Sequence, residues 1–284
     1  HLAFFKKFFP NIPALLVGHN IESDIFPFWI PQNLQGWKKS AVEFAAEKSR
    51  KNAHGVEFEN KWKFEAMTFI SQNDMDRVHA DVQKSYIPLC LPVQDIDYLQ
   101  KPSAPINLLW MGGFWWYPNA EGALWFARDI LPLIREKLDE LNINIHFLGA
   151  APPDDLKAVD DGKRVFVHGF VDSLKEVLDK THLLFVPLLS GGGVRVKILE
   201  AMSNGIPVIS TTKGCEGLGA TDGVNIMIRN TPAEFASGLV EMVKDGELRA
   251  RLSSAGRALL NEKYNLAKCI AEKDRIYQKI LASR

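Results

Sequence analysis

Short apolar runs alternate with amphipathic segments between residues 105 and 230, and this alternation constrains the fold more than any other feature of the sequence. The runs cover residues 106–111, 143–148, 165–167, 183–186 and 208–210. Short runs that are apolar on both faces are typical of parallel strands covered by helices on both sides. We therefore expect a doubly wound α/β domain whose strands are joined by helices.

Helix caps and breakers place helices between and after these strands. Three are expected between the strands: over 121–140 after Pro118–Asn119, over 174–180 after Asp172–Ser173, and from the glycines at 191–193 to Gly205. Three more are expected towards the C-terminus: one starting at Pro232, a second set off by Gly246, and a third over 266–282.

The first hundred residues resemble the end of a second α/β unit that lacks its earlier strands. We expect strands at 14–17 and 67–70 and a helix over 36–50. Two prolines in the polar-leaning segment 100–105 indicate a linker. The expected organisation is a partial N-terminal Rossmann-like domain (1–103), a C-terminal Rossmann-like domain (104–265) and a C-terminal helix (266–284), with the packing of that helix back on the N-terminal domain left open.

The charge balance argues against nucleic acid as a partner. Lys plus Arg and Asp plus Glu number 34 each, so no global field exists to hold a polyanion. Hydrophobic residues make up 46% of the chain, which predicts a sizeable core.

The cysteines and the absence of long apolar runs point to a soluble cytoplasmic protein. Cys90, Cys215 and Cys269 are odd in number, far apart and without CxxC spacing, so we expect neither a zinc site nor a disulfide framework. No run approaches the roughly 18 to 20 apolar residues that span a bilayer, and no signal peptide pattern is present. The start at His1 rather than Met suggests a fragment.

The segment Leu2–Phe9 is rich in phenylalanine around two lysines and has two interpretations. As a helix on a membrane surface it would give the protein a peripheral membrane contact. As a helix packed under part of its own domain it would have no such role, and we favour this second interpretation.

A glycine-rich turn follows the run 183–186 and leads into a helix. Gly191, Gly192 and Gly193 lie between Ser190 and Val194. Glycines let backbone N–H groups approach a ligand closely, and a helix start adds unpaired donors with a partial positive charge. The segment therefore predicts a binding site for a phosphate or diphosphate.

Arg195, Lys197 and Glu200 are the charged residues of the first two turns of this otherwise apolar helix. Lys197 and Glu200 are three positions apart and share a face, so a ligand can meet a cation and a carboxylate together. The alternative is a simple Lys–Glu pair on a core helix. We favour the ligand site because buried charges seldom lie on such a helix without a function.

At these residues the chain resembles the large family 4, or group 1, glycosyltransferases. In particular it is similar to a bacterial subgroup with the signature Gly-Gly-Gly-x-Arg-x-Lys-x-Leu-Glu-Ala-Met. Four further blocks match in order: 111–113, 118–126, 168–171 and 211–218. The resemblance is good over about residues 105–265 and loose over 14–100.

The resemblance implies a GT-B fold, a nucleoside diphosphate sugar as donor, retention of anomeric configuration, and no required metal or cofactor. It implies that Glu200 binds the ribose hydroxyls and that the turn from Ser190 to Val194 holds the diphosphate. It further implies base contacts from Gly169, Phe170 and Val171, and a cleft bordered by Gly112 and Gly113. The alternatives are that Gly169 only ends a strand and that Gly112–Gly113 is only a tight turn.

The chain departs from the broader family at two places. Gly192 stands where most members carry a first glutamate eight positions before Glu200, and residues 114–117 are aromatic where an Arg and a Lys are usual. We therefore expect Arg195 and Lys197 to supply the catalytic positive charge. The departures leave the details of the site in question rather than the assignment.

In the N-terminal part, Gly18–Glu22 resembles the family's His-Asn-x-Glu segment, which makes His19 a catalytic candidate, with a purely structural histidine as the alternative. Asp74–Asp76 and Asp95–Asp97 imitate the Asp-x-Asp of metal-dependent enzymes. Neither is near the glycine-rich helix in sequence, so we attribute both to chance and expect no metal site.

The leading hypothesis is transfer of a hexose-type unit to a glycan or lipid-linked acceptor in cell-surface polysaccharide or glycolipid synthesis. Two alternatives remain: a non-hydrolysing nucleotide-sugar epimerase, which would turn over without an acceptor, and a nucleotide-sugar-binding protein without catalysis.

Overall fold

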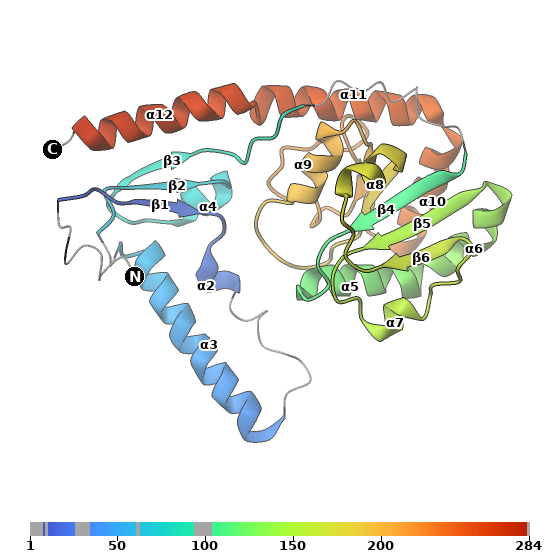
Figure 1. The fold of residues 1–284 in the computed structure, drawn as a ribbon, viewed down its shortest axis with the longest axis horizontal. Helices are drawn as coiled ribbons and strands as arrows, with labels where there is room; N and C mark the ends of the chain where they lie inside the picture. The colour runs from blue at the N-terminus through green and yellow to red at the C-terminus, as the bar shows by residue number, and fades with distance from the viewer. Residues whose placement is uncertain (1–7, 9–10, 26–34, 61–62, 94–103, 283–284) are drawn as a thin grey trace. The chain divides into compact units, whose positions relative to one another are not determined.

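The structure is a computed structural model that describes residue 8 and residues 11–25, 35–60, 63–93 and 104–282 (Figure 1). The chain forms two compact units. The first comprises residues 1–90, 192–194 and 266–284, and the second comprises 91–191 and 195–265. The expectations for Leu2–Phe9 apart from Phe8, for Asp95–Asp97 and for most of the linker at 100–105 fall outside the described residues.

A six-stranded parallel sheet forms the centre of the second unit. Its strands are β4 (Ile106–Met111), β5 (Ile143–Leu148), β6 (Val165–His168), β7 (Leu183–Val186), β8 (Val208–Ser210) and β9 (Met227–Ile228). Their order is β6-β5-β4-β7-β8-β9, which is a doubly wound order. The chain starts at β4 inside the sheet, runs through β5 to β6 at one edge, and returns to β7 on the other side of β4. The five apolar runs identified in the sequence are therefore strands, and the α/β fold class is confirmed.

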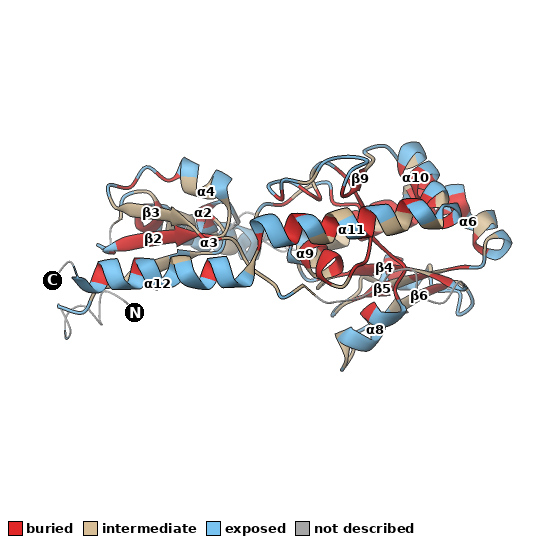
Figure 2. Cartoon of the chain, turned by 90° about the horizontal axis from the view of Figure 1, so that it is seen from above, coloured by how far each residue is buried: buried red, intermediate tan, exposed pale blue. Residues whose placement is uncertain are grey.

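Helices cover the sheet because side chains alternate between its faces. Leu108 and Trp110 of β4 and Ile145 and Phe147 of β5 join one buried cluster. They pack under α6 (Leu131–Glu140) and α10 (Pro232–Lys244), while α9 (Val196–Ser203) contacts β7 and β8 on the other face. Buried residues run along the strands and the inner sides of the helices (Figure 2).

Capping residues fix several of the helix starts that the sequence predicted. Ser173 accepts a hydrogen bond from the backbone of Glu176 at the start of α8 (Leu174–Lys180), and Thr231 forms a capping box with Glu234 at α10. The remaining helices of this unit are α5 (Tyr117–Trp125), α7 (Asp154–Lys157) and α11 (Gly246–Lys263). None of the helices in the described parts of the chain is long and apolar enough to cross a membrane.

Two helices of the second unit differ from the sequence expectation. The helix expected over 121–140 begins earlier, at Tyr117, and a π-helical turn, η3 (Phe126–Ile130), separates α5 from α6. The break lies just before Pro132, which has no N–H to continue the regular pattern. The helix after the glycines begins only at Val196, because Arg195 has a non-helical ψ of 78°.

The first unit contains a three-stranded parallel sheet of β1 (Leu15–Gly18), β2 (Ala66–Phe69) and β3 (Gln83–Tyr86). Its helices are α2 (Glu22–Ile25), α3 (Gly36–Glu57), α4 (Gln72–Arg77) and α12 (Leu266–Ala282). The sequence predicted β1 and β2 to within one residue at each end, but it predicted too short an α3 and missed β3.

The C-terminal helix packs on this small sheet. Cys269, Ile276 and Ile280 of α12 form a buried cluster with Ala66 and Ile87. The packing corrects the expectation for the cysteines, because it brings Cys269 beside Cys90 and the two form a disulfide across 179 residues of sequence. Spacing rules did not find this pair because long-range packing, not local sequence, makes it. Cys215 is free and buried.

Candidate active site

The second unit reverses its strand order between β4 and β7, and the predicted site residues lie after these two strands. Gly112 and Gly113 follow β4, and Ser190 and Gly191 follow β7. In open α/β sheets, ligands bind outside the carboxyl ends of the strands at such a reversal. The topology therefore places both glycine turns where a ligand is expected.

Close backbone packing shapes the turn after β4. Gly112 has a φ of +151° and donates its N–H to the carbonyl of Leu148 at 2.9 Å. A Cβ on the neighbouring Gly149 would come within 1.9 Å of the Gly112 carbonyl oxygen. Glycine is required at Gly149, because β4 and β5 approach too closely there for any side chain.

Lys197 reaches the turn after β4 from α9. Its Nζ donates to Asn119 Oδ1 at 2.9 Å and lies 4.5 Å from the centre of the Trp110 ring. A Cβ on Gly112 would be 2.7 Å from the same nitrogen. An ammonium has three donors, and within the described part of the chain Lys197 uses one of them. The lysine therefore presents positive charge and further donors beside the Gly112–Gly113 turn.

Burial, with a smaller effect from the nearby positive charge of Arg195, lowers the pKa of Lys197 from 10.5 to about 7. A charged ammonium in this place is therefore unfavourable unless an anion compensates it. Such a group is poised to gain stability from a bound phosphate.

Arg195 braces the glycine-rich turn from inside. It is 7% exposed, and its guanidinium donates to the carbonyl of Gly191 at 2.9 Å. Gly191 and Gly193 have φ values of +93° and +78°, which side chains rarely adopt. The turn then runs through Val194 to the start of α9, with Gly192 exposed.

Side chains of α5 contact the segments that follow β4 and β7. Asn119 accepts from Lys197 and donates its Nδ2 to the carbonyl of Gly113 at 2.9 Å. Two residues on, Glu121 accepts from the hydroxyl of Ser190 at 2.5 Å and from that of Tyr117 at 3.1 Å. These side chains fix the positions of Lys197 and Ser190 before any ligand arrives.

Glu200 does not pair with Lys197. Its carboxylate is partly buried, burial raises its pKa, and it has no side-chain partner within the described residues. The simple Lys–Glu pair that the sequence allowed is therefore absent from these residues, and a partly buried acceptor is left for a ligand.

The remaining predicted residues lie elsewhere. Gly169, Phe170 and Val171 follow β6, at the edge of the same sheet, where Phe170 is 84% exposed and a Cβ on Gly169 would meet nothing within 4 Å. His19 belongs to the first unit and Lys197 to the second.

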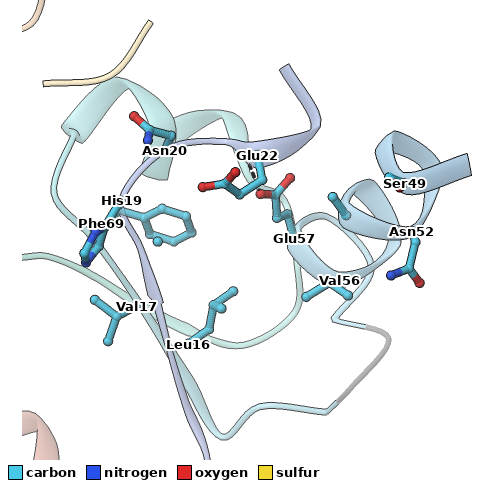
Figure 3. Close-up of a pocket in the computed structure, with 12 residues that line it drawn as sticks. Leu16, Val17, His19, Asn20, Glu22, Ser49, Asn52, Val56, Glu57 and Phe69 are labelled. Carbon is cyan, nitrogen blue, oxygen red and sulfur yellow. Dashed lines mark hydrogen bonds between the residues drawn. The ribbon is translucent and has the colours of Figure 1, made fainter. Parts of the chain in front are cut away.

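His19 lies beside a cavity of about 580 Å³ in the first unit (Figure 3). The cavity lies between the end of β1 and the last turns of α3. On its wall Glu57 accepts from the backbone N–H of Glu22 at 2.6 Å and from the hydroxyl of Ser23 at 2.8 Å. Burial raises the pKa of Glu57, so these donors are needed to hold its charged form.

The described residues contain no group of three or more His, Cys, Asp or Glu side chains suited to hold a metal. Asp74 and Asp76 lie in the short helix α4 of the first unit.

Sequence reasoning missed Asn119, Glu121 and Glu57 as contributors to these sites. Only Asn119 gave a signal, since Pro118–Asn119 is one of the matched blocks, but its partner lies 78 residues away. Glu57 lies in an ordinary amphipathic helix, where nothing in the local sequence distinguishes it.

Comparison with known proteins identifies the second unit. Residues 105–245 match the family described as "Glycosyl transferases group 1". An uncharacterised 44.6 kDa protein in the cps region of Klebsiella pneumoniae is 24% identical over 214 residues, which is 72% of this chain. The chain spans about half, 54%, of the length of that relative.

Solved structures share the fold at low sequence identity. Sucrose-phosphate synthase from Thermosynechococcus elongatus has a TM-score of 0.66 at 16% identity, covering 99% of this chain and 72% of its own. HepE from Anabaena, in complex with UDP and glucose, has a TM-score of 0.67 at 13% identity, covering 97% and 74%. WaaG, a glycosyltransferase involved in lipopolysaccharide biosynthesis, has a TM-score of 0.65 at 14% identity, covering 95% and 79%. Residues 105–245 therefore form a group 1 glycosyltransferase domain, and the likeness to the solved structures shows the GT-B fold.

Proposed function

We propose that the chain is the donor-binding part of a retaining, metal-independent glycosyltransferase. It transfers a sugar from a nucleoside diphosphate sugar to a glycan or lipid-linked acceptor in cell-surface polysaccharide or glycolipid synthesis. The observation that carries the proposal is Lys197 at the strand-order reversal, a cation with a lowered pKa held beside the Gly112–Gly113 turn. Among the described residues it uses only one of its donors.

The proposed chemistry is electrostatic. As the bond between sugar and diphosphate breaks, negative charge builds on the leaving diphosphate, and a fixed donor beside it lowers the barrier. Lys197 supplies the charge, Arg195 holds the turn from Ser190 to Val194 in shape, and that turn binds the diphosphate. Glu200 accepts from the ribose hydroxyls, and Gly169 to Val171 contact the base. His19 acts from the N-terminal domain.

The comparisons support this proposal. The Klebsiella relative is encoded in a cps region, HepE was crystallised with UDP and glucose, and WaaG takes part in lipopolysaccharide synthesis. A panel of nucleoside diphosphate sugars in a thermal-shift assay tests donor binding directly. A donor at a hundredfold excess over its dissociation constant stabilises the fold by about 2.7 kcal/mol. No stabilisation by any donor would reject the proposal, and turnover without an acceptor would favour an epimerase.

Replacing Glu200 by alanine is expected to weaken donor binding, and replacing it by glutamine to weaken it less. The ribose diol donates hydrogen bonds, which a carboxylate accepts better than an amide does. Calorimetric titration with the best donor measures the effect. If both variants bind as the parent does and only their melting temperatures change, Glu200 is structural.

Transfer is expected to continue at an unchanged rate after a chelator removes divalent cations. The positive charge for the diphosphate comes from the protein, at Lys197 and the helix start. The measurement is the initial rate of transfer with EDTA and after adding back Mn²⁺ or Mg²⁺. A rate that falls with EDTA and returns with the metal would show that a cation takes part.

A further inference from the structure

A second cavity, of about 730 Å³, lies in the second unit between α8 and the face of the sheet at β4, β5 and β6. Asn107, Asn144 and His146 point from the strands into it, and His168 and Val171 line it at the carboxyl end of the sheet. A parallel sheet covered by a helix normally presents apolar residues on that face. The polar floor is therefore a feature that the packing of the fold does not explain.

A hydrogen-bonded chain crosses this floor, and both of its amide groups have a fixed orientation. Arg164 can only donate, and its guanidinium lies 3.3 Å from Asn144 Oδ1, so Nδ2 of Asn144 faces Asn107. The backbone carbonyl of Lys180 can only accept, and it receives Asn107 Nδ2 at 2.9 Å. The contact with Asn144 and the contact with Lys180 therefore each identify Oδ1 of Asn107 as an acceptor.

These amides in turn fix the protons of two histidines. Asn107 Oδ1 lies 3.3 Å from His146 Nε2, which must therefore carry the proton. Burial, with a smaller effect of His168, lowers the pKa of His146 to about 4, so its ring is neutral and Nδ1 is an acceptor. That Nδ1 lies 3.1 Å from His168 Nε2, which must donate. With its one proton on Nε2, an imidazole ring at His168 has Nδ1 as its acceptor.

Aromatic contacts also hold the two rings in place. The ring of His146 is nearly parallel to that of Phe166, with ring centres 5.1 Å apart, and to that of His168, with centres 5.3 Å apart. His168 itself is exposed and directly precedes Gly169. His168 therefore carries its acceptor next to the loop of Gly169 to Val171, and it lines the cavity.

We propose that these hydrogen bonds make His168 a specificity-determining residue for the base of the donor. It selects a base with a ring N–H, as in uracil or guanine, over a base without one, as in cytosine or adenine. On the pairing edge, N3 of uracil and N1 of guanine carry a hydrogen and donate. N3 of cytosine and N1 of adenine are acceptors, and their lone pair would face the lone pair of His168 Nδ1. The inference rests on the proposed function, because it takes the loop after β6 as the place of the base.

Two matched pairs of nucleotides test the selection. The dissociation constants of UDP against CDP, and of GDP against ADP, are measured by calorimetry at one pH and salt concentration. In the pair that binds more tightly we expect the nucleotide whose base has the ring N–H to bind about tenfold more tightly. This is the effect of losing one hydrogen bond and leaving the acceptor of His168 without a donor. Equal affinity within both pairs overturns the inference. If none of the four nucleotides binds, the proposed function fails as well.

Substitutions distinguish the effect of these hydrogen bonds on base preference from the effect of side-chain packing. His168→Phe should bring the two members of the pair to within about twofold of each other, and His146→Phe should reduce the preference by freeing the His168 tautomer. Phe166→Leu, which removes the ring next to both histidines without touching the hydrogen bonds, should keep the preference. A loss as large in Phe166→Leu as in His168→Phe would overturn the inference.

The tautomers can also be read without any nucleotide. In ¹⁵N NMR spectra of the ligand-free protein, His146 and His168 should both carry their proton on Nε2. A proton on Nδ1 of the neutral His168 ring would refute the chain of hydrogen bonds even if nucleotides bind.

Discussion

Replacing Lys197 by methionine is expected to lower the turnover of sugar transfer by about ten- to a hundredfold and, at the same time, to make the protein harder to unfold at pH 6. The first effect follows from loss of a charge-assisted hydrogen bond to the leaving diphosphate, worth roughly 1.5 to 3 kcal/mol. Because this contact strengthens as the diphosphate departs, the loss should appear in turnover more than in the Michaelis constant.

The gain in stability follows from the lowered pKa. Lys197 titrates at about 7 in the folded protein, below its ordinary 10.5, so the fold penalises the charged form. The penalty is complete below pH 7, where folded and unfolded chains both carry the charge, and it disappears as pH rises from about 7 towards 10.5. Methionine has a similar length and no charge, so the free energy of unfolding should rise by about 1 kcal/mol at pH 6 and by less at pH 9.

The pH profile gives a further sign of the same group. In the parent protein, kcat/KM should fall as pH rises through about 7, because Lys197 loses its proton in the free enzyme. The fall should be absent in Lys197→Met. Lys157→Met is the control, because Lys157 forms an exposed pair with Asp154 on α7 and should change neither turnover nor stability noticeably. A Lys197→Met protein that is less stable and equally active would refute the assigned role.

The strands were the most predictable part of the fold. Those of the second unit are continuous apolar runs bounded by turn residues, so burial on both faces determines both their sequence and their structure. β3 escaped prediction because Gln83, Lys84 and Ser85 give it no apolar pattern, and each is only partly buried. The π-helical turn escaped because the apolar periodicity continues through it, and only Pro132 marks the break.

Only those parts of the candidate site whose residues are close in sequence could be predicted. The glycine turn, Lys197 and Glu200 lie within ten residues of one another, and their spacing shows a helix start with a shared face. The contact of Lys197 with Asn119 and the chain from Arg164 to His168 join residues far apart in sequence. Such contacts depend on strand order and register, which a single sequence does not specify.

Replacing Gly149 by alanine is expected to cause the largest loss of stability of any glycine substitution in the second unit. An ideal Cβ there would lie 1.9 Å from the Gly112 carbonyl oxygen and 2.7 Å from its carbon, both of them backbone atoms. The φ of +157° adds strain for any side chain. Relief requires the ends of β4 and β5 to separate, which we expect to cost about 3 kcal/mol. The melting temperature should fall by about 6 to 12 °C.

Gly169→Ala is the matched control for Gly149→Ala. Gly169 follows β6 just as Gly149 follows β5, but its φ is not strained and nothing lies within 4 Å of an added Cβ. Its substitution should leave the melting temperature within about 2 °C of the parent value. Because Gly149 holds the Gly112 turn, Gly149→Ala should also weaken nucleoside diphosphate binding at temperatures where the variant is still folded. Equal melting temperatures for the two variants would show that β4 and β5 can part at this point without loss, and that the close approach is not what fixes the turn beside Lys197.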